Sequence, residues 1–181
     1  AILIPAAGEP VKEIASGLGL IHAAEFPFMV REDLPIEPSG HEAVVVEMET
    51  GSGQSLEGTA AVSAAFRMPL ESTLRVLRPS LVGSPAMDIY VASLDGQTVG
   101  SVTLSHHGDT SGIWAMGTDP EAQGRGIGRR LLSTALADCR ERGAKRFFLG
   151  ATPAGFPLYE KLGFDTQVVA SVWVSGETSQ A

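Results

Sequence analysis

The chain has 181 residues, of which 44% are hydrophobic and 19% charged, and its formal net charge is −8. These proportions are typical of a soluble globular domain, and no apolar run approaches the roughly 20 residues that span a bilayer. A sequence pI near 4.9, without a basic stripe interleaved with aromatic residues, argues against nucleic-acid binding. We therefore expect neither a membrane nor a nucleic-acid partner.

Charge is unevenly distributed along the chain. Residues 1–120 contain 15 acidic and 5 basic residues, a net charge of −10, whereas residues 121–181 contain 6 and 8, a net charge of +2. The acidic part is either a solvated surface or a region that attracts a cationic amine. The single cysteine, Cys139, excludes an internal disulfide and suits a reducing cytoplasm. Its position on an apolar helix face predicts a small core residue.

Hydrophobic periodicity predicts a strand–helix–strand preamble at the start of the chain. Strands are expected at residues 2–4 and 26–31, a helix at 9–18, and a proline-containing linker at 32–41. This preamble is either an edge extension of the core or the tail of an upstream region. The first residues lack the basic and long apolar regions of a signal peptide, so we expect none there. They also lack an initiator methionine, which leaves open whether further residues precede them.

The core is expected over residues 42–174, with a polar tail at 175–181. In chain order, its predicted elements are a strand at 43–48, helices at 54–66 and 70–78, strands at 88–94, 98–104 and 111–118, a helix at 126–142, a strand at 146–151, a short helix at 156–162 and a strand at 168–174. The pair Asp95-Gly96 predicts a hairpin turn, and a second turn is expected at 106–109.

A glycine-rich turn between the strand 111–118 and the helix 126–142 is the most informative stretch. It contains Gly124, Gly126 and Gly128, with arginines beside them. A turn of this kind exposes consecutive backbone N–H groups at the positive end of a helix dipole, which makes a site for phosphate. The spacing fits neither a P-loop nor a GxGxxG fingerprint.

The arrangement Gln123-x-x-Gly126-x-Gly128 resembles the pyrophosphate-binding motif of the GNAT superfamily of acetyl-coenzyme A-dependent N-acyltransferases. Further along, Tyr159 followed by Leu162-Gly163-Phe164 is similar to the closing motif of that family, in which a short helix carries a tyrosine. The resemblance is clear over residues 86–174 and looser over 42–85.

The resemblance implies an α/β fold in which a mixed, mostly antiparallel sheet is flanked by helices and splays open between its fourth and fifth core strands. The βαβ-like preamble would be an addition to this fold. Acetyl-coenzyme A is the implied cosubstrate, with no metal, and a homodimer is expected by analogy alone. The implied cofactor contacts are the backbone of Met116 and Thr118 to pantetheine, the loop-shaping Gln123, and the pyrophosphate-binding turn of Gly124, Arg125, Gly126, Ile127, Gly128 and Arg129.

The implied reaction is direct transfer of acetyl to a primary amine of a small molecule or peptide in the cytoplasm. The sequence shows no arrangement of a nucleophilic serine or cysteine with an activating base, so a covalent acyl-enzyme is not expected. Tyr159 matches the tyrosine that serves many members as general acid toward the leaving thiolate, and its alternative is an aromatic that packs the short helix. A backbone N–H near Met116 is the family-like donor for the developing oxyanion.

The general base is not evident from the sequence. The fourth core strand lacks the glutamate that many members carry, and Thr152 stands where an asparagine is frequent. His106 and His107 are of a suitable type but are expected to be exposed in the turn, and Glu71 and Asp88 have no support.

Two alternatives to the acetyltransferase remain. One is a coenzyme A-binding sensor or interaction module without catalysis. The other is a transferase for a longer acyl group, which the small residues Ala115 and Gly117 would admit.

Overall fold

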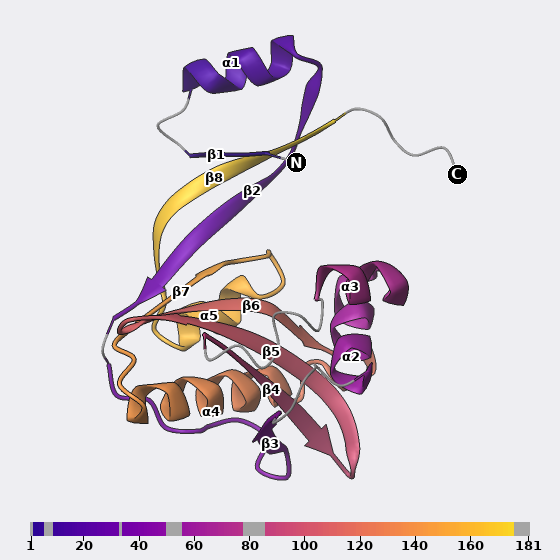
Figure 1. Cartoon of the computed structure of the whole chain (residues 1–181), viewed down its shortest axis with the longest axis vertical. Helices are drawn as coiled ribbons and strands as arrows, with labels where there is room; N and C mark the ends of the chain where they lie inside the picture. Colours follow the sequence, from indigo (N-terminus) through magenta and orange to yellow (C-terminus); the bar gives the residue numbers. More distant parts are fainter. Residues whose placement is uncertain (1, 6–8, 33, 50–55, 78–85, 176–181) are drawn as a thin grey trace. The chain divides into compact units, whose positions relative to one another are not determined.

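Figure 1 shows the computed structural model of the chain. The residues that it describes are 2–5, 9–32, 34–49, 56–77 and 86–175. The chain divides into two units, of which unit 2 is Arg31–Phe148 and unit 1 combines Ala1–Val30 with Leu149–Ala181. No helix in these described ranges is long and apolar enough to cross a bilayer.

Unit 2 contains a series of antiparallel strands, of which the last three are joined by tight turns. In order across the sheet they are β3 (Val45–Met48), β4 (Met87–Leu94), β5 (Gln97–His107) and β6 (Thr110–Thr118). Asp95 and Gly96 join β4 to β5 with φ angles of 53° and 79°, as expected of an Asp-Gly hairpin turn.

The helices of unit 2 cover both faces of this sheet. They are α2 (Leu56–Phe66), α3 (Leu70–Val76) and α4 (Ile127–Glu141), and a short 3-10 turn, η2 (Pro120–Ala122), precedes α4. A Cβ added at Gly100 of β5 would lie 3.5 Å from Leu131 of α4, whereas one added at Gly117, which pairs with Ser101, would lie 2.9 Å from Ala65 of α2. Because successive strand residues point to opposite faces, α4 and α2 lie on opposite sides (Figure 1).

The apolar stripe of α4 anchors the core of unit 2. Leu131, Leu132, Ala135, Leu136 and Cys139 are at most 2% exposed, as the helical spacing predicts. Full burial of each leucine contributes about 1.5–3 kcal/mol. The predicted role of Cys139 as a small core residue is confirmed.

Unit 1 contains the predicted preamble together with the last strand. The preamble forms β1 (Ile2–Pro5), α1 (Glu9–Gly17) and β2 (Leu20–Arg31), and both of its strands pair antiparallel with β8 (Asp165–Ser175). Two further elements are β7 (Arg146–Gly150), which leads from unit 2 into unit 1, and the short α5 (Phe156–Lys161). The proposed boundaries at 41/42 and 174/175 stay a prediction, and residues 176–181 of the tail lie outside the described residues.

Candidate functional site

Hydrogen bonds fix the glycine-rich turn to the end of β6. The Asp119 carboxylate accepts a bond from the Glu121 N–H at 2.9 Å, which caps the 3-10 turn. The Gln123 side chain donates to the Thr118 carbonyl, also at 2.9 Å. Gly124 and Gly126 then have φ angles of 75° and 80°, in the left-handed region that glycine enters without strain. Through its bond to the Thr118 carbonyl, Gln123 can hold the loop against the end of β6.

The N-terminus of α4 presents backbone donors at the end of this turn. Helices leave their first N–H groups without intrahelical partners. Gly126 is the N-cap residue and has no side chain to satisfy them, and no acidic residue lies in the first turn. Residues 123–126 are exposed. The positive end of the helix dipole therefore faces an accessible surface, which is the arrangement that binds phosphate at helix N-termini.

A β-bulge interrupts β6 just before the turn. Ser101 of β5 pairs with Gly117 and Thr103 pairs with Trp114, so that Ala115 and Met116 together oppose Val102. Ala115 has a φ of 47°. Bulges redirect backbone groups and are frequent next to active sites. Met116, whose backbone is predicted to contact the cofactor, thus lies within this bulge. No sequence pattern predicted the bulge.

Tyr159 lies in α5 of unit 1 and is buried. Its ring packs edge-on against Phe164 with centroids 6.1 Å apart, and a Cβ at Gly155 would approach the ring to 2.8 Å. Burial raises the pKa of Tyr159 to about 12, so its hydroxyl is protonated at neutral pH. Thr152 accepts a bond from the Gly155 N–H at 3.2 Å and so supports the turn before α5. The role of Tyr159 as acid stays a prediction.

The expectation that His106 lies exposed in a turn is wrong. Strand β5 extends to His107, and the turn consists of Gly108 and Asp109. His106 therefore pairs with Ser111 across the hairpin, where its Nδ1 lies 2.9 Å from the serine Oγ. Its Nε2 lies 2.7 Å from Asp88 Oδ2. His107 is exposed, as expected.

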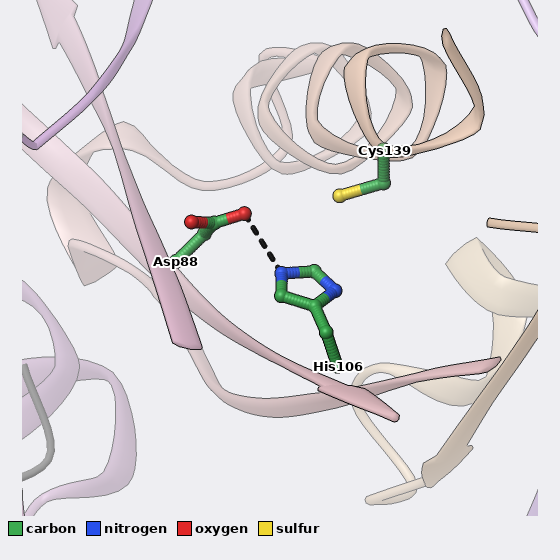
Figure 2. A group of neighbouring side chains, drawn as sticks. All are labelled: Asp88, His106 and Cys139. Carbon is green, nitrogen blue, oxygen red and sulfur yellow. Dashed lines mark hydrogen bonds and ion pairs between the residues drawn. The ribbon is translucent and has the colours of Figure 1, made fainter. Parts of the chain in front are cut away.

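Figure 2 shows that the side chains of Asp88, His106 and Cys139 converge from β4, β5 and α4. Their potential metal-ligating atoms lie within 4.8 Å of one another. No sequence pattern indicated this cluster, because its members are far apart along the chain.

A guanidinium group already supplies positive charge to this cluster. Arg142 Nη2 lies 2.6 Å from Asp88 Oδ2 and 3.3 Å from Cys139 Sγ. It also lies 3.1 Å from Asp138 Oδ2 and donates to the Tyr90 hydroxyl at 2.7 Å. Burial raises the pKa of the Cys139 thiol to about 11, so the thiolate that a metal prefers is disfavoured. We interpret the cluster as an internal charge network.

Comparison with known proteins assigns the family. A profile of the acetyltransferase (GNAT) family matches residues 60–164, more than half of the chain. The chain belongs to the GNAT acetyltransferase family. The family expected from the glycine turn and the closing motif is therefore confirmed.

Curated relatives of this GNAT protein carry the name mycothiol acetyltransferase. The protein from Beutenbergia cavernae is 30% identical over 175 residues, which covers 84% of this chain and 59% of the relative. The protein from Thermomonospora curvata is 34% identical over 91 residues, which covers 48% of this chain and 31% of the relative. The chain thus spans less than two thirds of the length of these relatives.

Solved structures confirm the expected GNAT fold. A GCN5-related N-acetyltransferase from Sphaerobacter thermophilus aligns with a TM-score of 0.75 at 17% identity, covering 98% of this chain and 61% of that one. A GCN5-related N-acetyltransferase from Kribbella flavida aligns with a TM-score of 0.73 at 14% identity, covering 97% of this chain and 68% of that one. At these identities the likeness concerns the fold alone.

Proposed function

We propose that this GNAT protein transfers an acetyl group from acetyl-coenzyme A directly to a primary amine of a small molecule or peptide. The observation that carries the proposal is the exposed N-terminus of α4, where a glycine-rich turn precedes a helix without a side-chain cap. In a member of this family, such a turn is suited to the pyrophosphate of the cofactor.

In this proposal the backbone N–H groups of residues 125–129 hold the pyrophosphate. Gln123 keeps the turn in place through its bond to the Thr118 carbonyl. The exposed side chains of Arg125 and Arg129 add positive charge that attracts the phosphates. Backbone groups of Met116 and Thr118 bind the pantetheine arm, and the proposal includes no metal.

The chemical step joins the amine nitrogen to the acetyl carbonyl carbon and breaks the carbon–sulfur bond. A backbone N–H near Met116 stabilises the oxyanion, for which the bulge at Ala115 supports a special backbone geometry. Tyr159 donates a proton to the leaving thiolate, and its raised pKa keeps that proton in place at neutral pH. The amine proton leaves to a base or to water. We assign no residue to that base.

The acceptor is proposed only as a class. The relatives named mycothiol acetyltransferase make the acceptor of those enzymes the first compound to test. The net charge of −10 over residues 1–120 either attracts a cationic amine or belongs to a solvated acidic surface. A homodimer and a cytoplasmic location stay predictions.

The test combines binding and turnover. Acetyl-coenzyme A, coenzyme A and dephospho-coenzyme A are titrated while the melting temperature is followed, and acetyl transfer is then assayed over an amine panel that includes the acceptor of mycothiol acetyltransferases. We expect stabilisation by several degrees, because a ligand that binds only the folded state stabilises it. We also expect turnover that falls in Tyr159→Phe. Absence of any stabilisation would contradict the proposal.

The same experiment separates the two alternatives. The non-catalytic binding module is favoured by the lack of an acidic residue on β6, and it predicts cofactor binding without turnover. The alternative of a longer-acyl transferase was based on the small size of Ala115 and Gly117. A Cβ at Gly117 would lie 2.9 Å from both Ala65 and Val62 of α2, so Gly117 no longer supports this alternative. The small size of Gly117 therefore serves helix packing. Competition between acyl-coenzymes A of different chain length tests what remains of this alternative.

A further inference from the structure

A short segment before β3, residues 39–41, lies against the N-terminal turns of α4. It was expected to be part of a linker, and it has neither helical nor strand structure. We call Ser39, Gly40 and His41 the strap. All three lie against residues of the turn or of the first two turns of α4, and these contacts carry the inference.

Ser39 is tied to α4 through two side chains. Its N–H donates to Ser133 Oγ at 2.9 Å, and the Ser133 hydroxyl lies 3.2 Å from the Ser39 carbonyl oxygen. Ser133 is fully buried, so this anchor is shielded from water. Arg129 Nε donates to Ser39 Oγ at 2.9 Å. Since a guanidinium carries five N–H donors, this bond orients Arg129 while leaving its two Nη groups to other acceptors.

Gly40 lies so close to the turn that no side chain fits between them. A Cβ at this position would lie 2.5 Å from the Gly126 carbonyl oxygen and 2.8 Å from the Arg130 nitrogen. The φ of Gly40 is 120°, which other residues rarely adopt. Any larger residue would therefore push the strap and the turn apart.

His41 reaches the peptide unit at which α4 begins. Its N–H donates to the Gly126 carbonyl oxygen in a long bond of 3.4 Å, and the same oxygen accepts the Arg130 N–H at 3.0 Å. Because a peptide unit is planar, holding the Gly126 C=O also fixes the direction of the Ile127 N–H on its opposite side. That N–H is one of the donors proposed for the pyrophosphate.

We propose that the strap positions the phosphate-binding turn and the Arg129 guanidinium for coenzyme A. Ser39, Gly40 and His41 are positioning residues that hold the donors in the geometry required by the phosphates. The inference rests on the proposed function, because it assumes that the turn binds the cofactor.

The test compares two glycine substitutions with similar backbone strain. Gly40→Ala introduces the clash with the turn. Gly143→Ala is the matched control, because Gly143 has a φ of 105° and no atom within 4 Å of its added Cβ. We expect Gly40→Ala to raise the Kd for coenzyme A and the KM for acetyl-coenzyme A by at least about tenfold, with kcat within about twofold of the wild type. Gly143→Ala should leave the Kd and the KM unchanged.

A gentler variant keeps the test decisive if Gly40→Ala does not fold. Ser39→Ala removes the partner of Arg129, and we expect it to raise the Kd for coenzyme A by about three- to tenfold with little change in melting temperature. If Ser39 acts through Arg129, its effect should largely disappear in an Arg129→Ala background. An effect of the same size in both backgrounds would overturn this part of the proposal.

The outcomes separate the strap from the cofactor site itself. Wild-type protein that fails to bind coenzyme A would overturn the proposed function, and the role of the strap with it. If the wild type binds coenzyme A and both strap variants bind it equally well, only the strap proposal is overturned. Weaker binding by the strap variants, with the control unchanged, is the expected result.

Discussion

Arginine side chains lie near both ends of α4, but they differ in ion pairing. Near the N-terminal end, Arg125 and Arg129 are exposed, and no described carboxylate forms an ion pair with either. Just past the C-terminal end, Arg142 bridges Asp88 and Asp138 and also contacts Tyr90. The helix rises about 1.5 Å per residue, so Gly126 and Cys139 lie about 20 Å apart along its axis.

This contrast separates the proposed binding surface from a structural network. At the C-terminal end, the protein satisfies its own charges, so little remains for a ligand. At the N-terminal end, backbone donors and arginines face an accessible surface, and the glycines keep side chains out of the way. Substitutions at the N-terminal end should therefore change cofactor affinity, and substitutions at the C-terminal end should change stability.

The largest effect is expected from a carboxylate placed at the proposed phosphate site. In Gly126→Asp, a negative charge competes with the pyrophosphate for the donors at the start of α4, and we expect the Kd for coenzyme A to rise by about 100-fold or more. Gly126→Asn is the matched control, because asparagine has a similar shape, tolerates a φ of 80° and carries no charge. Calorimetric titration measures both. Equal affinities of the two variants would contradict an anion site.

The charge network offers the converse test. Arg142→Gln removes the cation that bridges Asp88 and Asp138, and we expect the free energy of unfolding to fall by about 1–3 kcal/mol. The lower part of this range is favoured, because the side chain of Arg142 is 43% exposed and water screens the lost pairs. Urea denaturation measures the change. An altered Kd for coenzyme A in this variant would contradict the claim that the C-terminal end of α4 affects stability alone.

Tyrosine ionisation provides a pH-dependent test. The chain has two tyrosines, and burial raises the pKa of both, that of Tyr159 to about 12. Because the folded pKa values exceed the unfolded value near 10, their stabilising contribution is complete below pH 10 and is lost as the pH rises through the folded pKa. We expect the native protein to show almost no tyrosinate absorbance at pH 10, where the unfolded chain is half ionised. Half-ionisation of native protein at pH 10 would refute this burial.

The smallest effect concerns the thiol of Cys139. It is 2% exposed, and its pKa is raised to about 11 by burial, so thiolate is scarce at pH 8. A disulfide reagent should react very slowly with native protein at this pH and completely in urea. Rapid reaction of the native protein would show that the network around Arg142 opens readily.

Local sequence patterns predicted the parts of the fold that depend on local interactions. The apolar spacing of α4 and the Asp95-Gly96 turn carry their signals within a few residues, and the structure agrees with both. The same holds for the motif between Gln123 and Gly128, from which the family could be inferred. Such features need no knowledge of remote partners.

Features that depend on distant partners were missed. Strand β2 begins at Leu20 rather than at residue 26, because pairing with β8 extends a segment without a strand pattern of its own. The cluster around Cys139 and the approach of Gly40 to Gly126 likewise join residues far apart in the chain. No periodicity or motif indicates contacts of this kind.

The central claim is that the N-terminus of α4 binds the pyrophosphate of coenzyme A through backbone N–H groups. The most direct measurement follows the backbone amide resonances of ¹⁵N-labelled protein during titration with coenzyme A. We predict large, saturable shifts for residues 125–129 and small ones for residues 139–143 at the other end of the helix. Saturable binding that leaves residues 125–129 unshifted would contradict the claim.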